Sequence, residues 1–244
     1  MKLTKSLHKY YLNQRFFPGL FSIFINPFYF IRKPLVKQIR MYAKELNGRL
    51  LDFGCGTKPY LSLFSHMSEY IGVDVENEGH SHETEDIDVF YDGKTLSFED
   101  GSFDSVLASE VLEHTPDIIS SLSEIRRVLK MNGKILITVP FVWPEHELPY
   151  DFRRYTEAGI DKILSDNGFR TIAHNKIGTF FEVIIQLWMM YLHDLFYVKN
   201  KYTNLLINFI FISPFCLIGL LFSLIFPKRK SLYFGSVILA EKIK

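Results

Sequence analysis

The sequence is poor in cysteine, with two among 244 residues, and it carries no surplus of charge of either sign. Two cysteines are too few for a disulfide framework, so the cysteines do not indicate a secreted protein. A formal net charge of +1 argues against a domain that attracts nucleic acid, and we expect no nucleic-acid partner. The chain also lacks internal repeats and Gly/Ser linkers, and its 48% of hydrophobic residues excludes the disordered classes.

Phenylalanine is abundant and unevenly placed. Of the 23 Phe, six lie in residues 15–31 and eight in residues 180–226. Charge is uneven as well, because residues 1–44 hold nine Lys or Arg and no acid, and residues 176–230 hold six Lys or Arg and two acids. The remainder has 13 basic and 25 acidic residues, a net charge of −12. Basic aromatic segments of this kind are typical of surfaces that lie on anionic lipid.

This distribution predicts three parts. We expect basic aromatic membrane-interface helices over residues 1–44 and a hydrophobic membrane-associating insertion over residues 180–230. The acidic body between and after them, residues 45–179 and 231–244, has the composition of an ordinary globular domain.

Within the body, predicted strands alternate with predicted helices. Strands are expected at residues 49–53, 69–74, 87–91, 103–109, 134–140, 169–176 and 232–241. Helices are expected at residues 34–46, 59–67, 117–130 and 156–167. This order predicts an α/β fold with a Rossmann-like, seven-stranded, mostly parallel sheet and helices on both faces. A hydrophobic helical hairpin is inserted before the last strand. Ligands of such sheets bind at the carboxyl ends of the strands.

Candidate site residues follow these strand ends. The first strand runs into Asp52-Phe53-Gly54-Cys55-Gly56, where two glycines let the backbone turn sharply and approach a ligand, although a plain strand–helix turn has the same pattern. Asp74 ends the second strand, where an acid accepts hydrogen bonds from ribose hydroxyls or caps a helix. Asp92-Gly93 follows the third strand, and the fourth ends at Ser109-Glu110-Val111-Leu112-Glu113-His114.

In order and spacing these motifs resemble those of the class I S-adenosylmethionine-dependent methyltransferases, over roughly residues 45–176 and the last strand. The motifs are similar to those of the type 11-like members, and residues 141–156 resemble a subgroup associated with bacterial cell-surface polysaccharide synthesis. The resemblance implies S-adenosyl-L-methionine as the cofactor. It assigns the methionine part to Asp52, Phe53, Gly54, Cys55 and Gly56, the ribose to Asp74 with Val75, the adenine to Asp92 with Gly93, and the methyl side of the pocket to Ser109.

The sequence departs from the family pattern at Lys58, which stands at the position of the third glycine; Pro59, opening the next helix, is expected to compensate. A dinucleotide oxidoreductase is the competing interpretation of the fold. It fits less well, because Pro59 stands where the third glycine of its GxGxxG motif belongs.

The acceptor side is expected in the loop of residues 141–156, which is rich in polar and aromatic groups. His146 in this loop and His114 after the fourth strand are the candidate catalytic bases. The alternative for His146 is a structural lid in which Asp151 and Arg154 hold the loop together. We expect no metal, because a sulfonium donor is already activated and the protein supplies mainly alignment and a base.

Recognition of the acceptor is expected from the same loop. Trp143 suits stacking on a sugar, and Arg153 or Arg154 suits a phosphate.

Residues 205–226 carry no charge over 22 residues, which as a helix is about 33 Å and long enough to cross a bilayer core. Residues 180–198 contain polar groups that are costly in lipid. Because the last strand must rejoin the sheet, a single crossing is excluded. We expect a monotopic hairpin on the cytoplasmic face of the membrane; two full spans, or an apolar hairpin in a soluble protein, are the alternatives.

Together these features predict S-adenosylmethionine-dependent methyl transfer to a membrane-linked acceptor, a lipid-linked saccharide hydroxyl or phosphate. Methylation of a quinone or other lipid head group is the alternative, since the Glu113-His114 pair resembles that of quinone-directed members of the family. A non-catalytic membrane scaffold is a third interpretation. The set of Asp52, Asp74 and Asp92 argues against it, because a scaffold does not need these residues.

Overall fold

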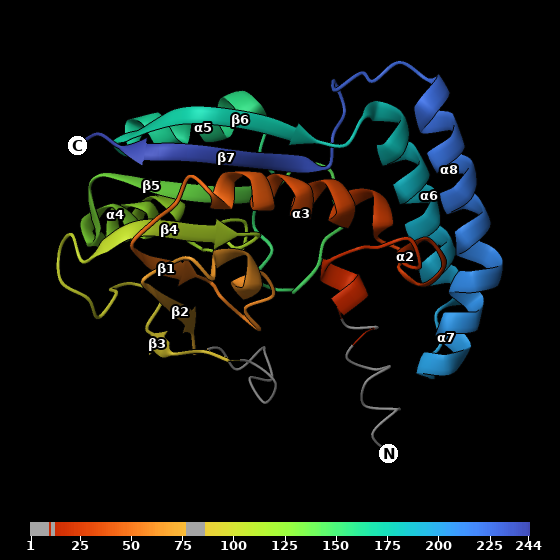
Figure 1. Cartoon of the computed structure of the whole chain (residues 1–244), viewed down its shortest axis with the longest axis horizontal. Coiled ribbons are helices and arrows are strands. Elements are labelled where there is room, and N and C mark those ends of the chain that lie inside the picture. Colours follow the sequence, from red (N-terminus) through yellow and green to blue (C-terminus); the bar gives the residue numbers. More distant parts are fainter. Residues whose placement is uncertain (1–9, 11–12, 77–85) are drawn as a thin grey trace. The chain divides into compact units, whose positions relative to one another are not determined.

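The computed structural model of the chain describes residue 10, residues 13–76 and residues 86–244 (Figure 1). The membrane-interface helices predicted over residues 1–44 therefore lie partly outside the described residues. The chain divides into two compact units. The first comprises the chain up to residue 37 together with residues 177–234, and the second comprises residues 38–176 with 235–244. We call them the helical unit and the sheet unit.

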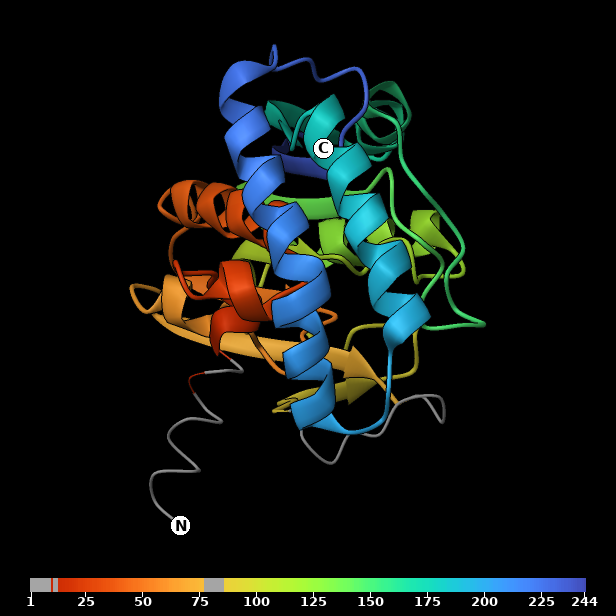
Figure 2. The ribbon, with the colours of Figure 1, turned by 90° about the vertical axis from the view of Figure 1, so that its right-hand side faces the viewer.

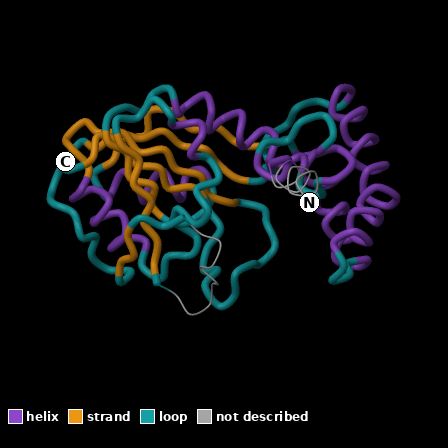
Figure 3. The backbone as a smooth tube through the Cα atoms, turned by 60° about the horizontal axis from the view of Figure 1, so that its bottom comes forward, coloured by secondary structure: helices purple, strands orange, loops and turns teal. Residues whose placement is uncertain are grey.

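The sheet unit is built on one seven-stranded sheet in the order β3-β2-β1-β4-β5-β7-β6. Figure 3 shows its strands gathered in one layer. The strands are β1 Arg49–Phe53, β2 Glu69–Val75, β3 Val89–Tyr91, β4 Phe103–Ser109, β5 Leu129–Pro140, β6 Phe169–Ile177 and β7 Gly235–Lys242. β1 is parallel to both β2 and β4, whereas β7 is antiparallel to β5. The predicted Rossmann-like, mostly parallel sheet is confirmed.

The central strands are buried because helices cover them. The face shared with α4 (Ile118–Val128) and α5 (Glu157–Asp166) forms one apolar cluster. Leu122 and Ile125 of α4 are fully buried, as are Ile135 and Ile137 of β5. The last turns of α3 (Tyr29–Ala43) lie on the other face, where Ile39 is buried (Figure 1).

Two predicted elements differ from the structure. The helix expected at 59–67 is only the short 3₁₀ turn η1, Leu61–Phe64. Helix α4 was expected to continue to Asn132-Gly133, but it ends at Val128 and β5 begins at once. Asn132 has a φ of +61° inside β5, next to the irregularity in its pairing with β4, so the pair marks a distortion in a strand rather than a helix end.

The helical unit contains α2 (Ser22–Ile25), the start of α3, α6 (Phe180–Phe196), α7 (Lys201–Ile207), a π-helical turn η3 (Asn208–Ile212) and α8 (Ser213–Ile225). Figures 1 and 2 show α6 beside α8, so residues 180–225 form a helical hairpin. Among the described helices, the continuous stretch Tyr202–Ile225 is long and apolar enough to cross a membrane by length and composition.

Polar side chains of α6 are satisfied within the helical unit. Gln186, fully buried, donates to the Pro27 carbonyl at 2.6 Å and accepts from the Phe30 amide at 3.3 Å. His193 Nδ1 lies 3.1 Å from Asn208 Oδ1 on the π-helical turn. The inward side of α6 therefore combines apolar residues with Gln186 and His193, whose polar groups are bonded within the helical unit.

Candidate active site

The turn after β1 requires glycine. Gly54 has a φ of +71°, and a Cβ atom there would lie 2.1 Å from Val111 Cγ2. The amides of Gly54 and Cys55 both donate to the Val73 carbonyl of β2, at 2.9 and 3.0 Å. These contacts bend the backbone back across the carboxyl ends of two neighbouring strands. This is the edge at which parallel sheets of this type bind ligands.

Asp74, at the end of β2, is joined directly to this turn. Its Oδ2 accepts from the Gly56 amide at 2.8 Å and its Oδ1 accepts from the Val75 amide at 2.8 Å. The structure thus brings Asp74 and the predicted glycine loop together. Asp74 and Gly56 are 18 positions apart in the sequence, so their contact results from the parallel pairing of β1 with β2.

Asp52 lies beneath the turn and is nearly inaccessible, with 3% of its surface exposed. The Tyr70 hydroxyl donates to its Oδ2 at 2.5 Å. Burial raises the pKa of Asp52 to about 7, and the negative charge of Asp74 adds to the rise, while the hydrogen bond from Tyr70 opposes it. Its neighbour Phe53 is buried against Tyr91, with ring centroids 5.7 Å apart.

Cys55 is not a reactive thiol. The side chain is buried, and desolvation raises the pKa of the thiol well above its usual range. The thiolate, which is the nucleophilic form, is therefore disfavoured. We therefore interpret Cys55 as a small buried residue of the turn and not as a nucleophile.

Lys58 explains how the loop departs from the family pattern. Its φ of +47° is in the left-handed region that the glycine of the motif would adopt. Its side chain is 6% exposed, and Nζ lies 2.7 Å from Asp88 Oδ2, which also accepts from the Gly72 amide at 2.7 Å. The ion pair, in which Lys58 is buried and Asp88 is 41% exposed, opposes the cost of the backbone strain. The expected compensation by Pro59 at the start of a helix is not what the structure shows, since only the short η1 follows.

The predicted adenine and methyl-side residues occupy the next strand ends. Asp92 Oδ1 accepts from the Lys94 and Thr95 amides, both at 2.8 Å, so its carboxylate closes its own turn. A Cβ atom on Gly93 would lie 3.7 Å from Val75 Cγ1, which places the two predicted positions side by side. Ser109 Oγ lies 3.0 Å from Thr138 Oγ1 and is tied to β5.

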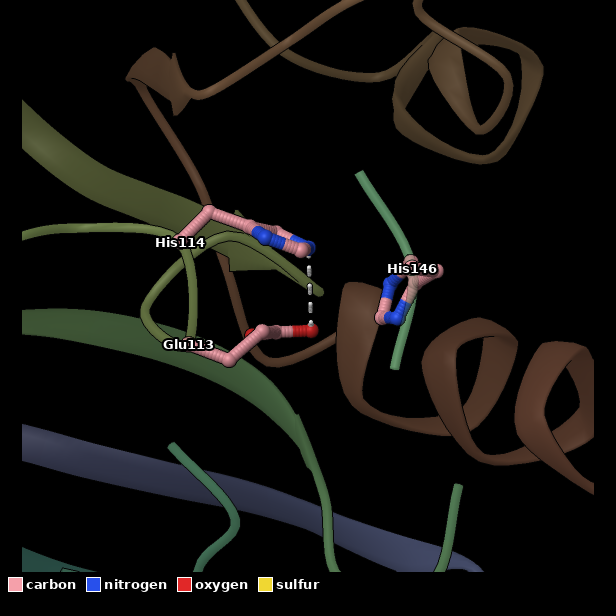
Figure 4. A group of neighbouring side chains, drawn as sticks. All are labelled: Glu113, His114 and His146. Carbon is pink, nitrogen blue, oxygen red and sulfur yellow. Dashed lines mark ion pairs between the residues drawn. The ribbon is translucent and has the colours of Figure 1, made fainter. Parts of the chain in front are cut away.

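His114 and His146 meet at this same edge (Figure 4). Their ring centroids are 4.7 Å apart at an interplanar angle of 85°. His114 Nδ1 lies 2.9 Å from the Tyr150 carbonyl, and His146 Nδ1 lies 3.3 Å from Asp151 Oδ2. The two candidate bases predicted from separate loops therefore form one cluster.

The loop of residues 141–156 is held by its own charged side chains. Arg154 donates to both carboxylate oxygens of Asp151, at 2.5 and 2.6 Å, and also to the Pro144 carbonyl at 2.9 Å. Arg153 donates to the Thr115 and Pro116 carbonyls at 2.5 and 2.8 Å. Both guanidinium groups are thus bonded within the fold. This arrangement favours the structural lid over the predicted phosphate grip.

Glu113 was named in the sequence only as the partner of His114 in the Glu113-His114 pair, and its burial was not predicted. It is fully buried, and neither carboxylate oxygen accepts a hydrogen bond from the described residues. Desolvation raises the pKa of this carboxyl, and the charge of Glu110 raises it further. An acid next to a predicted base was visible in the sequence. Its burial depends on β4, β5 and the loop packing over it, which no local pattern reveals.

Residues 51–137 match the family described as methyltransferase domain. The demethylmenaquinone methyltransferase of Staphylococcus saprophyticus is 34% identical over 116 residues, 43% of this chain and 48% of that protein. The phosphatidylethanolamine N-methyltransferase of Cereibacter sphaeroides is 29% identical over 110 residues, 41% of this chain and 54% of that protein. The chain thus spans about half the length of these relatives.

Among solved structures, a SAM-dependent methyltransferase from Archaeoglobus fulgidus aligns with a TM-score of 0.55 at 20% identity, over 96% of this chain and 99% of the other. This likeness shows the fold. Together with the family match and the glycine turn after β1, it identifies residues 51–137 as an S-adenosylmethionine-dependent methyltransferase domain.

Proposed function

We propose that the protein transfers a methyl group from S-adenosylmethionine to an acceptor anchored in a membrane. The observation that carries the membrane part is the exposed apolar surface of the helical hairpin. Among its large hydrophobic side chains, Leu224 is 82% exposed and Ile225 is 67% exposed. Soluble proteins rarely leave so continuous an apolar surface in water.

The hairpin has the dimensions and flanks for lipid. Tyr202–Ile225 has 24 residues, about 36 Å as helix, and only 28% of its most apolar window is buried. Lys228, Arg229 and Lys230 follow it and are exposed, as suits a segment beside anionic head groups. Insertion from one face fits best, because β6 and β7 are neighbours in the sheet and the chain must leave and return on the same side.

The acceptor is proposed as a lipid-linked saccharide hydroxyl or phosphate on the cytoplasmic face. Confinement of enzyme and acceptor to one surface raises their effective concentration. The second candidate is a quinone or phospholipid head group, which the names of the matched relatives favour.

The test uses the full chain in detergent with methyl-labelled S-adenosylmethionine and a total lipid extract. Label is expected in the organic phase with the wild type and not with Asp74→Ala, which removes the acceptor of the Gly56 amide. Label that mild acid releases into the aqueous phase identifies a saccharide; label that stays with the quinone or phospholipid fraction identifies the second candidate. Label in water-soluble or protein fractions alone would refute a membrane acceptor.

A further inference from the structure

The carboxylate of Glu113 is buried, and no hydrogen-bond donor among the described residues stabilises its negative charge. It is 0% exposed, and its two oxygens accept no hydrogen bond from any part of the chain that the structure describes. A buried, uncompensated carboxylate is costly, so native proteins pair it, protonate it or place it against a metal ion. The group therefore needs an explanation that hydrogen bonding within the fold does not supply.

Two imidazoles converge on this carboxylate. One ligand atom each from Glu113, His114 and His146 lie within 4.8 Å of one another, and His114 Nε2 is 3.8 Å from Glu113 Oε1. Figure 4 shows the three side chains approaching from two segments, with Glu113 and His114 after β4 and His146 after β5. Carboxylate and imidazole are both common ligands of divalent transition metals.

The hydrogen bonds behind the rings are those of metal-binding histidines. A carbonyl oxygen only accepts, so the Tyr150 carbonyl 2.9 Å from His114 Nδ1 fixes the proton there and leaves the lone pair on Nε2. His146 Nδ1 likewise faces Asp151 Oδ2 and the Pro144 carbonyl, both at 3.3 Å. Metal-ligating histidines almost always donate their other ring N–H to a carboxylate or carbonyl in this way.

We propose that Glu113, His114 and His146 form a binding site for a divalent transition-metal ion, with Zn²⁺ as the best match to two imidazoles and one carboxylate. Ligands about 2.0 Å from a tetrahedral ion are about 3.3 Å apart, so the ligand atoms, which lie within 4.8 Å of one another, must approach by about 1.5 Å at most. Three protein ligands leave a position open, as in catalytic zinc sites. If the proposed function holds, an oxygen of the acceptor occupies that position.

This site changes the role expected for the two histidines. A ligand to a metal ion is not free to take the acceptor's proton, so His114 and His146 would orient the acceptor through the ion. The proposal departs from the expectation of no metal, which rested on the sulfonium donor being activated without one. The observation that motivates the change is the cluster of Glu113, His114 and His146.

The experiment titrates chelator-treated full-length protein with Co²⁺, which reports its coordination by visible absorption, and with Zn²⁺ in competition. The wild type is expected to bind about one ion. Glu113→Gln and His146→Ala are expected to bind at least about 100-fold more weakly. His66→Ala is the matched control, because His66 Nε2 lies near the Ala43 and Leu46 carbonyls at another place in the sheet unit, and it should bind as the wild type does.

S-adenosylhomocysteine binding is measured on the same samples to show that each variant is folded. Wild-type protein that binds S-adenosylhomocysteine but no metal ion would contradict the metal site. The buried carboxylate of Glu113 would then be explained by an ion pair with a protonated His114. Glu113→Gln that keeps wild-type metal affinity would overturn it as well. Metal binding without any methyl transfer would leave the site standing and refute the proposed function instead.

Discussion

Lys58 Nζ lies 2.7 Å from Asp88 Oδ2, and this ion pair joins the glycine loop after β1 to the residue that precedes β3. The Lys58 side chain crosses Gly72 of β2, where a Cβ atom would lie 2.3 Å from Lys58 Cε. A residue that breaks the glycine pattern of the family thus belongs to the loop's support. It also makes Gly72 necessary, because any side chain there would displace the lysine.

Lys58→Met is expected to lower the free energy of unfolding by about 1–3 kcal/mol, since it leaves Asp88 with only the Gly72 amide. Lys58→Gly should lower the free energy of unfolding by less than Lys58→Met does. Glycine adopts the positive φ at this position without the strain of about 1 kcal/mol that other residues have there. Urea denaturation of both variants provides the comparison. If Lys58→Gly is the less stable of the two variants, the backbone at this position is not strained and the ion pair has no strain to offset.

Gly54→Ala is expected to destabilise the protein by about 2–5 kcal/mol, because it adds a collision with Val111 to the strain of a positive φ. Gly93→Ala is the matched control. Its φ of +77° gives the same strain, but a Cβ atom there meets only Val75 Cγ1 at 3.7 Å, so a loss of about 1–2 kcal/mol is expected. If denaturant titrations give equal losses of unfolding free energy for the two variants, the Val111 side chain moves aside and the turn is not closely packed.

Asp52 should make the stability of the ligand-free protein fall as pH rises. Its pKa is about 7 in the folded protein and about 4 in the unfolded chain, so between these values the folded state binds more protons. Asp52→Asn removes this effect. The variant should gain on the order of 4 kcal/mol relative to the wild type between pH 4 and pH 8. A difference that does not change with pH would mean that Asp52 ionises normally.

The double variant Leu221→Glu/Leu224→Glu is expected to bind anionic vesicles at least about tenfold more weakly than the wild type. The reason is that an acidic side chain is costly in a helix that is inserted in lipid. Both leucines are exposed in the hairpin, at 57% and 82%, so the fold should tolerate the change. Met131→Glu is the control, because Met131 is 57% exposed in β5, away from the hairpin in sequence. The wild type is expected to float with the vesicles. If the double variant floats to the same extent, the hairpin is not the membrane anchor.

The sheet was predictable because its strands are short apolar runs bounded by turns. The sequence Arg49–Phe53 is such a run, and its burial follows from its central place in a sheet whose faces are covered by helices. Asn132-Gly133 was misread because the same dipeptide ends helices and distorts strands. The choice between them depended on Phe103 and Leu129 pairing across β4 and β5, which is a tertiary contact.

The candidate site was predictable only where a motif fixes the backbone. The sequence placed the turn at Gly54 and the acid at Asp74 at two strand ends, and the resemblance to the methyltransferases supplied their expected roles. The pairing of Lys58 with Asp88 joins residues 30 apart, and the burial of Glu113 depends on three segments that fold together. Neither leaves a periodic signal in the sequence.

The account depends above all on the loop after β1 binding S-adenosylmethionine, and calorimetric titration with S-adenosylhomocysteine tests this directly. The wild type is expected to bind one equivalent, and Asp74→Ala, which frees the Gly56 amide, is expected to bind at least about tenfold more weakly. Folded wild-type protein that shows no binding would contradict the account.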